Sequence, residues 1–438
     1  MTIRVSLAAM AMAATLAGIG GVSAETTLTI ATVNNPDMIV MQKYSSQFEK
    51  ETGIKLNWLV LEENVLRQRV TTDISTKGGQ FDIITIGMLE APMWGKSGWL
   101  VPFDNLPADY DVDDVLPTVR QGLSHDGKLY ALPFYAESTL TFYRTDLFKK
   151  AGLTMPDQPT WTQISDFAAK LDDKAHDVYG LCIRGQPGWG ENLALVNLMG
   201  NVFGGQLFNM DWTSGFDSDS FKKALKLYVD LGTKFGPPGM VGNGFNENLA
   251  LMSSGKCAMW VDASVAAGVL YDPKRSKIAD SVGVAQAPIE TWSMGKGWLW
   301  AWALGVPSSS QHVAEAQKFI EWATSKNYIQ MIGEKEGWVT APPGTRKSTY
   351  ANAAYTAAAP FAAATLASIE IEDPVHTTQH PKPYLGVNFA AVPEYQGIGN
   401  FTAQEVAAAL TGKTSVDDAL AAAAANSDKV MKKAGYIK

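Results

Sequence analysis

The sequence predicts a chain that folds into two α/β lobes. Its 438 residues exceed what one hydrophobic core serves, because cores stop growing at roughly 250–300 residues. Hydrophobic residues make up 46% and charged residues 18% of the chain, as in folded globular proteins. Strand and helix patterns alternate along the sequence, and this order is typical of a parallel sheet with right-handed crossovers.

Residues 1–24 are expected to be a secretory signal peptide that is removed from the fold. Arg4 gives a positive start, residues 5–19 are rich in Ala, Leu and Met, and Val22-Ser23-Ala24 fits a signal peptidase site. We therefore expect cleavage after Ala24 and export to the periplasm. No cysteine stands at the cleavage site, so we expect no lipid anchor. No later run approaches the ~20 apolar residues needed to span a bilayer.

The first third of the chain is predicted to be strand–helix–strand–helix–strand. Thr27–Ile30 alternates polar and apolar residues, as a strand with one buried face does. A helix with its N-cap at Asp37 follows and ends at Gly53, because apolar residues recur between them at helical spacing. The remaining elements are a strand at 54–58, a helix at 66–74 and an almost wholly apolar strand at 81–86.

The same alternation returns after residue 160. Predicted helices lie at 161–171, 191–199, 221–231 and 312–324, and predicted strands at 179–183, 257–261, 282–285 and 298–306. From Ala351 onward the chain is rich in alanine and predicted to be helical, apart from a proline-rich passage between Pro374 and Pro393. No period of roughly 20–50 residues recurs, which excludes a solenoid or a propeller.

Charge and motifs exclude several classes of function. Lys plus Arg total 36 against 44 Asp plus Glu, and no stretch concentrates the basic residues, so nucleic acid is not an expected partner. The sequence contains no G-x-S-x-G elbow, H-E-x-x-H motif, Walker loop or G-x-G-x-x-G after a strand. His376 and His380 have metal-ligand spacing, but the prolines around them favour a solvated loop. We expect no enzyme activity, no cofactor and no metal.

The chain has two cysteines, Cys182 and Cys257. In an oxidising compartment they either form a disulfide or remain buried thiols inside strands. The sequence leaves both alternatives open.

Tryptophan, with 13 residues, is the side chain used beyond what packing requires. Trp298, Trp300 and Trp302 alternate on one predicted strand, so they project from one face about 6.6–6.8 Å apart. An indole face suits the C–H faces of a sugar or polyol, and its N–H donates to a hydroxyl. The alternative is an aromatic core stripe. Gly295 and Gly297 indicate a loop just before Trp298, which makes it the first candidate.

A second candidate region is the loop from Arg184 to Glu191, which is rich in Gly and Pro and contains Trp189. Loops carry ligands more often than regular elements do, and an arginine just past a strand end can donate several hydrogen bonds. The alternative is a surface turn with a packed tryptophan.

Acceptor side chains stand just beyond the ends of several predicted strands. They are Asn34, Asn35, Glu90, Glu137 and Asp262. In open α/β sheets, ligands bind outside the carboxyl ends of the strands, so these positions are expected to converge. An ionised carboxylate is an acceptor only, which selects a ligand with many O–H donors. Each residue alone is better explained as a helix cap or a solvated charge, but together they predict a cleft that is rich in acceptors and lined by tryptophan.

Several segments resemble one protein family. Residues 48–55, 81–84, 128–135 and 143–148 resemble family 1 extracellular solute-binding proteins, the maltose-binding-protein-like receptors of ABC importers. The resemblance runs in order from about Thr26 to the C-terminus. Within the family, segments 132–138, 181–190 and 297–300 look like the branch that binds sorbitol and mannitol.

The resemblance implies a two-lobed periplasmic-binding-protein fold. Each lobe is expected to be a mostly parallel sheet flanked by helices, with a hinge of two or three crossover strands. The N-terminal lobe is expected at 25–134 and 287–340, and the C-terminal lobe at 135–286 and 341–438.

The resemblance also places the ligand between the lobes. Carried over by position, the ligand loops fall at Asn34-Asn35, Glu90, Tyr135–Glu137, Asp262 and Trp298–Trp300. The maltodextrin receptors have an Asp-Arg pair where this chain has Leu89-Glu90, which favours a smaller neutral ligand.

The sequence therefore predicts a monomeric periplasmic receptor that captures a sugar alcohol, a sorbitol- or mannitol-like hexitol or related polyol. It would deliver this ligand to the membrane permease of an ABC importer. The predicted binding residues are Asn34, Asn35, Glu90, Tyr135, Glu137, Arg184, Trp189, Asp262, Trp298 and Trp300.

Two alternatives stay open. One is a receptor for a mono- or oligosaccharide or a charged solute. The other is an exported glycosidase that uses two of Glu90, Glu137 and Asp262 as its carboxylates.

Overall fold

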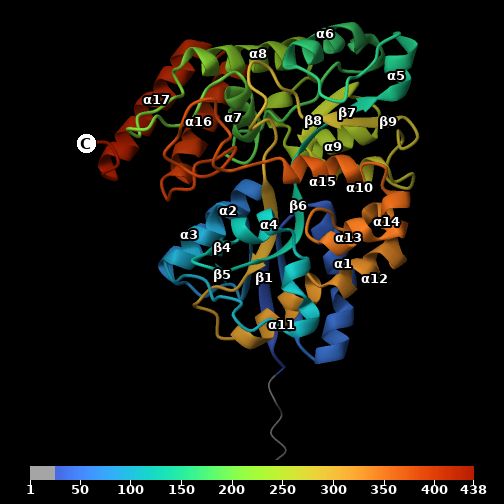
Figure 1. Cartoon of the computed structure of the whole chain (residues 1–438), viewed down its shortest axis with the longest axis vertical. Coiled ribbons are helices and arrows are strands. Elements are labelled where there is room, and N and C mark those ends of the chain that lie inside the picture. Colours follow the sequence, from blue (N-terminus) through green and yellow to red (C-terminus); the bar gives the residue numbers. More distant parts are fainter. Residues whose placement is uncertain (1–24) are drawn as a thin grey trace, which may run out of the picture.

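The computed structural model of the protein describes residues 25–438. The predicted signal peptide, residues 1–24, and its cleavage after Ala24 lie outside the described residues. The chain forms two lobes that follow one another along the long axis of the molecule, each built of a sheet and surrounding helices (Figure 1). No helix between Glu25 and Lys438 is long and apolar enough to cross a membrane.

The sheet of the N-terminal lobe has five strands in the order β2-β1-β3-β10-β6. The strands are β1 (Thr27–Val33), β2 (Lys55–Leu61), β3 (Ile83–Ile86), β6 (Leu132–Glu137) and β10 (Trp300–Gly305). Strand β1 is parallel to β2 and β3, as the strand–helix alternation predicts, and β10 is antiparallel to β3 and β6. All four residues of β3 are buried, which confirms a strand covered on both faces.

The first helix, α1 (Pro36–Thr52), begins earlier than predicted. Its N-cap is Asn35, whose side-chain oxygen accepts a hydrogen bond from the N–H of Met38, so the prediction of Asp37 was wrong. Pro36 explains the shift, because its fixed φ and missing N–H suit the first helical position. Gly53, at φ 75°, ends the helix as predicted.

Further helices surround this sheet. They are α2 (Glu63–Thr76), α3 (Glu90–Lys96), α4 (Pro117–Gly122), α11 (Val313–Ala323), α12 (Lys326–Glu336), α13 (Lys347–Ala351) and α14 (Ala353–Ala358), with a short hairpin of β4 (Ser124–His125) and β5 (Lys128–Leu129). Strands β1 and β2 are joined by α1, and β2 and β3 by α2, which gives the parallel crossovers.

The sheet of the C-terminal lobe has three strands in the order β8-β7-β9, namely β8 (Met259–Ala263), β7 (Thr139–Arg144) and β9 (Val282–Gln286). Strand β7 is antiparallel to both neighbours, so the predicted mostly parallel sheet is wrong for this lobe. The reason is that β7 follows β6 with only Ser138 between them and enters the lobe as its central strand.

The predicted strand at 179–183 is also wrong. Only isolated bridges form there, between Tyr179 and Cys257 and between Cys182 and Trp260. Cys182 and Cys257 are bonded to each other, with their Cα atoms 5.8 Å apart. The disulfide joins this irregular segment to the residues that lead into β8, which answers the question that the sequence left open.

The helices of the C-terminal lobe pack around this sheet and beside it (Figure 1). They are α5 (Thr145–Lys150), α6 (Trp161–Leu171), α7 (Asn192–Val202), α8 (Asp219–Phe235), α9 (Phe245–Ser253), α10 (Ala267–Leu270), α15 (Ala362–Glu370), α16 (Tyr395–Leu410) and α17 (Val416–Lys433). The alanine-rich region is helical as predicted, and the proline-rich passage forms the loop between α15 and α16.

The chain passes between the lobes first at Ser138, where β6 ends and β7 begins. Residues 287–297, expected in the N-terminal lobe, hydrogen-bond to the C-terminal lobe instead: the N–H of Trp292 donates to the carbonyl of Val202. Arg346, expected in the C-terminal lobe, donates to the carbonyls of Tyr110 and Thr324 in the other lobe. The remaining division of the chain between lobes stays a prediction.

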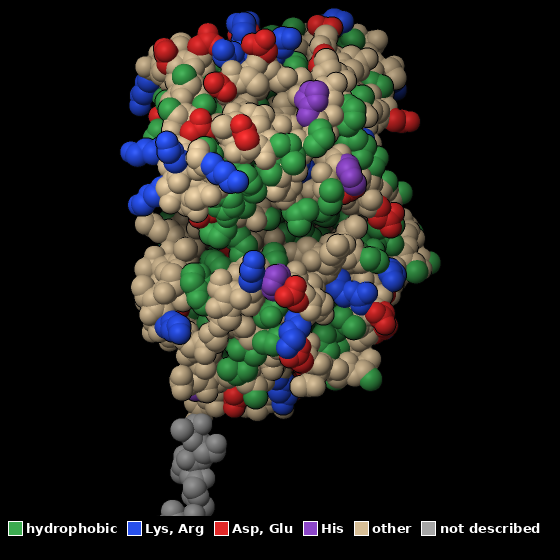
Figure 2. All heavy atoms as spheres, turned by 60° about the vertical axis from the view of Figure 1, so that its left-hand side comes forward, with side chains coloured by type: hydrophobic (Ala, Val, Ile, Leu, Met, Phe, Trp, Pro, Cys, Tyr) green, Lys and Arg blue, Asp and Glu red, His purple; other side chains and the backbone are tan. Residues whose placement is uncertain are grey.

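On the face shown in Figure 2, hydrophobic side chains gather along the seam between the lobes, and the surface is hollowed there. An apolar cavity at the seam is lined by Met88 and Leu299 from one side and by Val375, Leu385 and Phe389 from the proline-rich passage.

Candidate functional site

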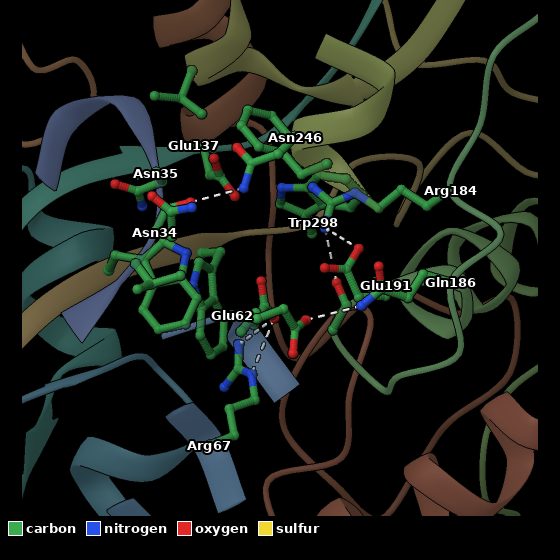
Figure 3. A pocket seen from close by; sticks show the side chains of 18 of the residues that line it. Asn34, Asn35, Glu62, Arg67, Glu137, Arg184, Gln186, Glu191, Asn246 and Trp298 are labelled. Atoms are coloured by element: carbon green, nitrogen blue, oxygen red, sulfur yellow. Dashed lines mark hydrogen bonds and ion pairs between the residues drawn. The ribbon is translucent and has the colours of Figure 1, made fainter. Parts of the chain in front are cut away.

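A cavity of about 760 Å³, part of it open to solvent, lies between the two lobes. The N-terminal lobe lines it with Val33, Asn34, Asn35, Glu62, Glu63, Arg67, Tyr135, Glu137, Trp298, Trp300 and Trp302. The C-terminal lobe lines it with Arg184, Gln186, Trp189, Gly190, Glu191, Ala194, Phe245, Asn246, Glu247, Val265 and Asn388. Figure 3 shows the polar side chains of both sets pointing toward one space.

The parallel strands bring the first polar residues to this space. Asn34 follows β1, and Glu62 and Glu63 follow β2, because the carboxyl ends of parallel strands lie at one edge of the sheet. Asn35 caps α1 with its oxygen and donates from Nδ2 to the hydroxyl of Tyr135 over 2.9 Å. This bond fixes both side chains at the cavity wall.

Four tryptophans form the apolar wall of the cavity. Trp300 packs edge-to-face against Trp189 from the other lobe and against Trp302, with ring centroids 5.6 Å apart in both pairs. Trp298 precedes β10 and also lines the cavity. The indole nitrogens of Trp189 and Trp298 are buried, and neither has a hydrogen-bond partner among the described residues. These rings are buried and also line the cavity, and their contact with a ligand stays a prediction.

Arg67, on α2, lies beneath this wall. Its Nε donates to Glu63 over 3.0 Å and its Nη1 to Glu90 over 2.7 Å. The guanidinium carbon lies 4.1 Å from the ring centre of Trp189 and 4.7 Å from that of Trp302. Arg67 therefore joins the two lobes through cation–π contacts, while its charge is balanced by two carboxylates.

Arg184 has the same arrangement in the C-terminal lobe. Its Nε and Nη2 donate to Asp262, the shortest contact being 2.6 Å, and its Nη1 donates to the carbonyl of Gly190 and to Glu191. Asp262 also accepts from the indole N–H of Trp260 over 3.0 Å. The guanidinium carbon lies 5.3 Å from the ring centre of Trp298.

Glu137 lines the cavity at the end of β6 and is 5% exposed. Its Oε2 is buried and, within residues 25–438, has no hydrogen-bond donor. Burial raises the pKa of Glu137 well above its ordinary value; Arg184 opposes this rise, and Asp262, Glu63 and Asp37 add to it. Burial likewise raises the pKa of Glu191 to about 8.

Two predicted binding residues, Glu90 and Asp262, do not line the cavity. Each lies behind an arginine that does, so its carboxylate is occupied by the guanidinium. The other eight predicted residues all line the cavity, and their role as ligand contacts stays a prediction.

Sequence reasoning missed several lining residues: Glu62, Glu63, Arg67, Gln186, Glu191, Phe245, Asn246, Glu247 and Asn388. The signal for Glu62 and Glu63 was present, because they follow a predicted strand as Asn34 and Asn35 do. Gln186 and Glu191 belong to the glycine-rich loop that was singled out. Asn246 and Asn388 carry no local signal, since only the tertiary fold brings them to the cavity.

Hydrogen bonds cross the seam at the cavity. Asn246 donates from Nδ2 to the carbonyl of Asn34 over 2.8 Å, and Gln186 donates from Nε2 to Glu62 over 2.9 Å (Figure 3). The two lobes are thus in contact around the site. His376, on the exposed loop that was predicted, pairs with Asp373, and no group of three metal-ligating side chains occurs in the described part of the chain.

Comparisons with known proteins agree on one family. Residues 35–329 match the family of bacterial extracellular solute-binding proteins. A mannitol-binding protein from Pseudomonas aeruginosa is 54% identical over 413 residues, which cover 94% of each chain.

Solved structures are similar over nearly the whole chain. An ABC transporter solute-binding protein from Agrobacterium vitis S4, with bound D-mannitol, has a TM-score of 0.93 at 56% identity and covers 94% of this chain and 100% of its own. Another, from Agrobacterium radiobacter K84 in complex with ribitol, has a TM-score of 0.82 at 26% identity and covers 92% and 98% of the two chains.

Proposed function

Because the chain belongs to the family of bacterial extracellular solute-binding proteins, we propose that it captures a sugar alcohol between its lobes for uptake by an ABC transporter. The observation that carries the proposal is the cavity itself. Tryptophans and carboxylates from both lobes line one space between them. Similar proteins include a mannitol-binding protein and two ABC transporter solute-binding proteins, one with bound D-mannitol and one in complex with ribitol.

The chemistry of the cavity suits a neutral polyol. A hexitol carries a hydroxyl on every carbon, and these hydroxyls donate to acceptors such as Glu137 and the carbonyl and amide groups of the wall. The indole nitrogens of Trp189 and Trp298, which have no partner among residues 25–438, are available to donate to ligand oxygens. The apolar C–H edges of the polyol then lie against the tryptophan rings.

Binding is coupled to the closure of the two lobes. A ligand that contacts both lobes has a higher affinity for the closed form, so it shifts the population toward that form. Periplasmic binding proteins are known examples of hinge closure around a ligand. The closed lobes would then present a joint surface to the membrane permease of the importer.

The same proposal includes export to the periplasm, a monomeric receptor and the absence of catalysis. The glycosidase alternative needed two free carboxylates among Glu90, Glu137 and Asp262. Two of these three are held by arginines at 2.7 Å and 2.6 Å, which leaves Glu137 without a second carboxylate from this set. This geometry supports a binding role.

Isothermal titration calorimetry tests the proposal directly. We expect saturable heat with D-mannitol or D-sorbitol, weaker binding of ribitol, and none of maltose. Turnover of a panel of glycosides would be measured in parallel. No heat with any polyol, or hydrolysis of a glycoside, would contradict the proposal.

A further inference from the structure

Within the described part of the chain, Glu137 differs from the other carboxylates of the cavity because its side chain accepts no hydrogen bond. Glu62 accepts from Gln186, Glu63 from Arg67, Glu191 from Arg184 and Glu247 from the N–H of Gly244. Among the described residues, no hydrogen bond reaches the side chain of Glu137, and its Oε2 is inaccessible to solvent. A buried acceptor without a partner is costly, so a donor from the ligand that pairs with this side chain would be stabilising.

The charge of the cavity is also unbalanced. Five glutamates line it against two arginines, and neither lysine nor histidine is among the lining residues. Both arginines are already paired, and each of them also contacts a carboxylate that lies outside the wall, Glu90 or Asp262. Among the described lining residues, the cavity therefore offers no unpaired positive charge to an anion, and its acidic side chains outnumber its basic ones.

The charged groups around Glu137 also favour a ligand that brings a positive charge. The charged groups that act on it are Arg184, which favours its ionised form, and Asp262, Glu63 and Asp37, which disfavour that form. Burial disfavours it as well. What this carboxyl lacks is a nearby cation that is not already paired with another acid.

We propose that the cavity also binds linear amino-polyols, in which a protonated amine replaces a terminal hydroxyl and lies against Glu137. An ammonium group is similar in size to a hydroxyl and has three donors, so it fits the position of a chain-end hydroxyl. A charge-assisted hydrogen bond is roughly twice as strong as a neutral one, and it offsets the loss of hydration of the ammonium group. The aromatic wall adds a second favourable contact for a cation. The inference rests on the proposed polyol function and extends its ligand class.

The test compares three ligands of one carbon skeleton by calorimetry at pH 7: D-mannitol, 1-amino-1-deoxy-D-mannitol and D-mannonate. We expect the amine to bind at least as tightly as mannitol, and the anion to show no binding. Binding of mannitol with weaker binding of the amine would overturn this inference and leave the proposed function standing. Absence of binding by all three would contradict the proposed function itself.

A substitution then assigns the effect to Glu137. Glu137→Gln keeps the shape and removes the charge, so we expect it to weaken the amine at least tenfold more than it weakens mannitol. Glu334→Gln, an exposed glutamate on α12, is the matched control and is expected to change neither affinity. Equal losses for both ligands in Glu137→Gln would overturn the assignment. Circular dichroism and the melting temperature verify that each variant is folded.

Discussion

At the scale of single residues, the site is organised by two arginines that carboxylates hold in place. Arg67 and Arg184 come from different lobes, each lies against tryptophan rings, and each is paired with an acid behind the cavity wall. Because a guanidinium is planar and rigid, a carboxylate that binds it from behind fixes the face that it presents to the ligand. Glu90 and Asp262 are thus positioning residues in this interpretation.

The substitution Asp262→Asn tests this role. We expect it to weaken D-mannitol binding by about 1.5–3 kcal/mol, since Arg184 loses the charged partner that orients it. It should also lower stability, because breaking one side of a buried ion pair costs about 3–5 kcal/mol. Calorimetry at low temperature on folded protein measures the first effect, and urea unfolding measures the second.

The exposed pair of Asp113 with Arg120 supplies the control for that experiment. Asp113 has a side chain that is 85% exposed, and surface pairs contribute about 0–1 kcal/mol. Asp113→Asn should therefore change neither binding nor stability appreciably. An Asp262→Asn variant that is destabilised but binds mannitol as the wild type does would show that Asp262 supports the fold alone.

At the scale of secondary-structure elements, the sequence predicts the strands and helices that depend on a local pattern. It does not predict strand pairings between residues that are distant in the sequence. The strands and helices of the first third were recognised from alternation and helical spacing, and Gly53 was recognised as a helix end. The antiparallel arrangement of β7 was not, because strand direction in a sheet depends on partners more than 100 residues away, as in the pairing of Thr139 with Ala263.

The same limit governs the site. A strand-end rule located Asn34, Asn35 and Glu137 at the cavity, because parallel strands bring their carboxyl ends to one edge. The same rule placed Glu90 and Asp262 near the site. It did not predict that they lie behind Arg67 and Arg184, because this position depends on how α2 and the 184–191 loop pack. The sequence contains no local mark for such a contact.

The disulfide belongs to this scale because it joins two segments that carry the site. Cys182 precedes Arg184 by two positions, and Cys257 leads into the strand that bears Asp262. Both cysteines are fully buried. The bond thus restrains the irregular segment that the sequence misread as a strand.

Replacing both cysteines by alanine is expected to lower the free energy of unfolding by about 2–4 kcal/mol, the usual effect of removing a native cross-link that closes a long loop. Urea denaturation with intrinsic fluorescence measures it. The comparison is the wild-type protein unfolded with and without reductant, which should show a loss of similar size. An unchanged free energy of unfolding in the double variant would indicate that packing alone holds the two segments together.

At the scale of the whole molecule, function depends on how closely the lobes approach. Direct hydrogen bonds from Asn246 and Gln186 cross the seam, and Arg67 contacts rings from both sides. Such contacts exist only when the lobes are together, so they contribute to the affinity of the closed form alone. A change that hinders approach, without touching the ligand, should therefore weaken binding.

Gly188 offers a place to make that change. It lies in the 184–191 loop but does not line the cavity, and a Cβ atom added to it would lie 2.4 Å from Oδ1 of Asn64 on the opposite lobe. Rotation of the Asn64 side chain could make room for a single Cβ, so the test uses leucine, which adds three further carbons at the seam. Gly188→Leu should hinder the approach of the lobes and weaken D-mannitol binding by about 1–3 kcal/mol, the typical effect of overpacking. X-ray scattering should show a smaller contraction on addition of mannitol. Stability without ligand should change little, because the open form is free of the clash.

Gly242→Leu is the matched control, since an added Cβ at Gly242 meets nothing within 4 Å. If Gly188→Leu binds mannitol with the affinity of Gly242→Leu, the seam does not need to close for binding, and closure cannot be the step that couples the two lobes to the ligand.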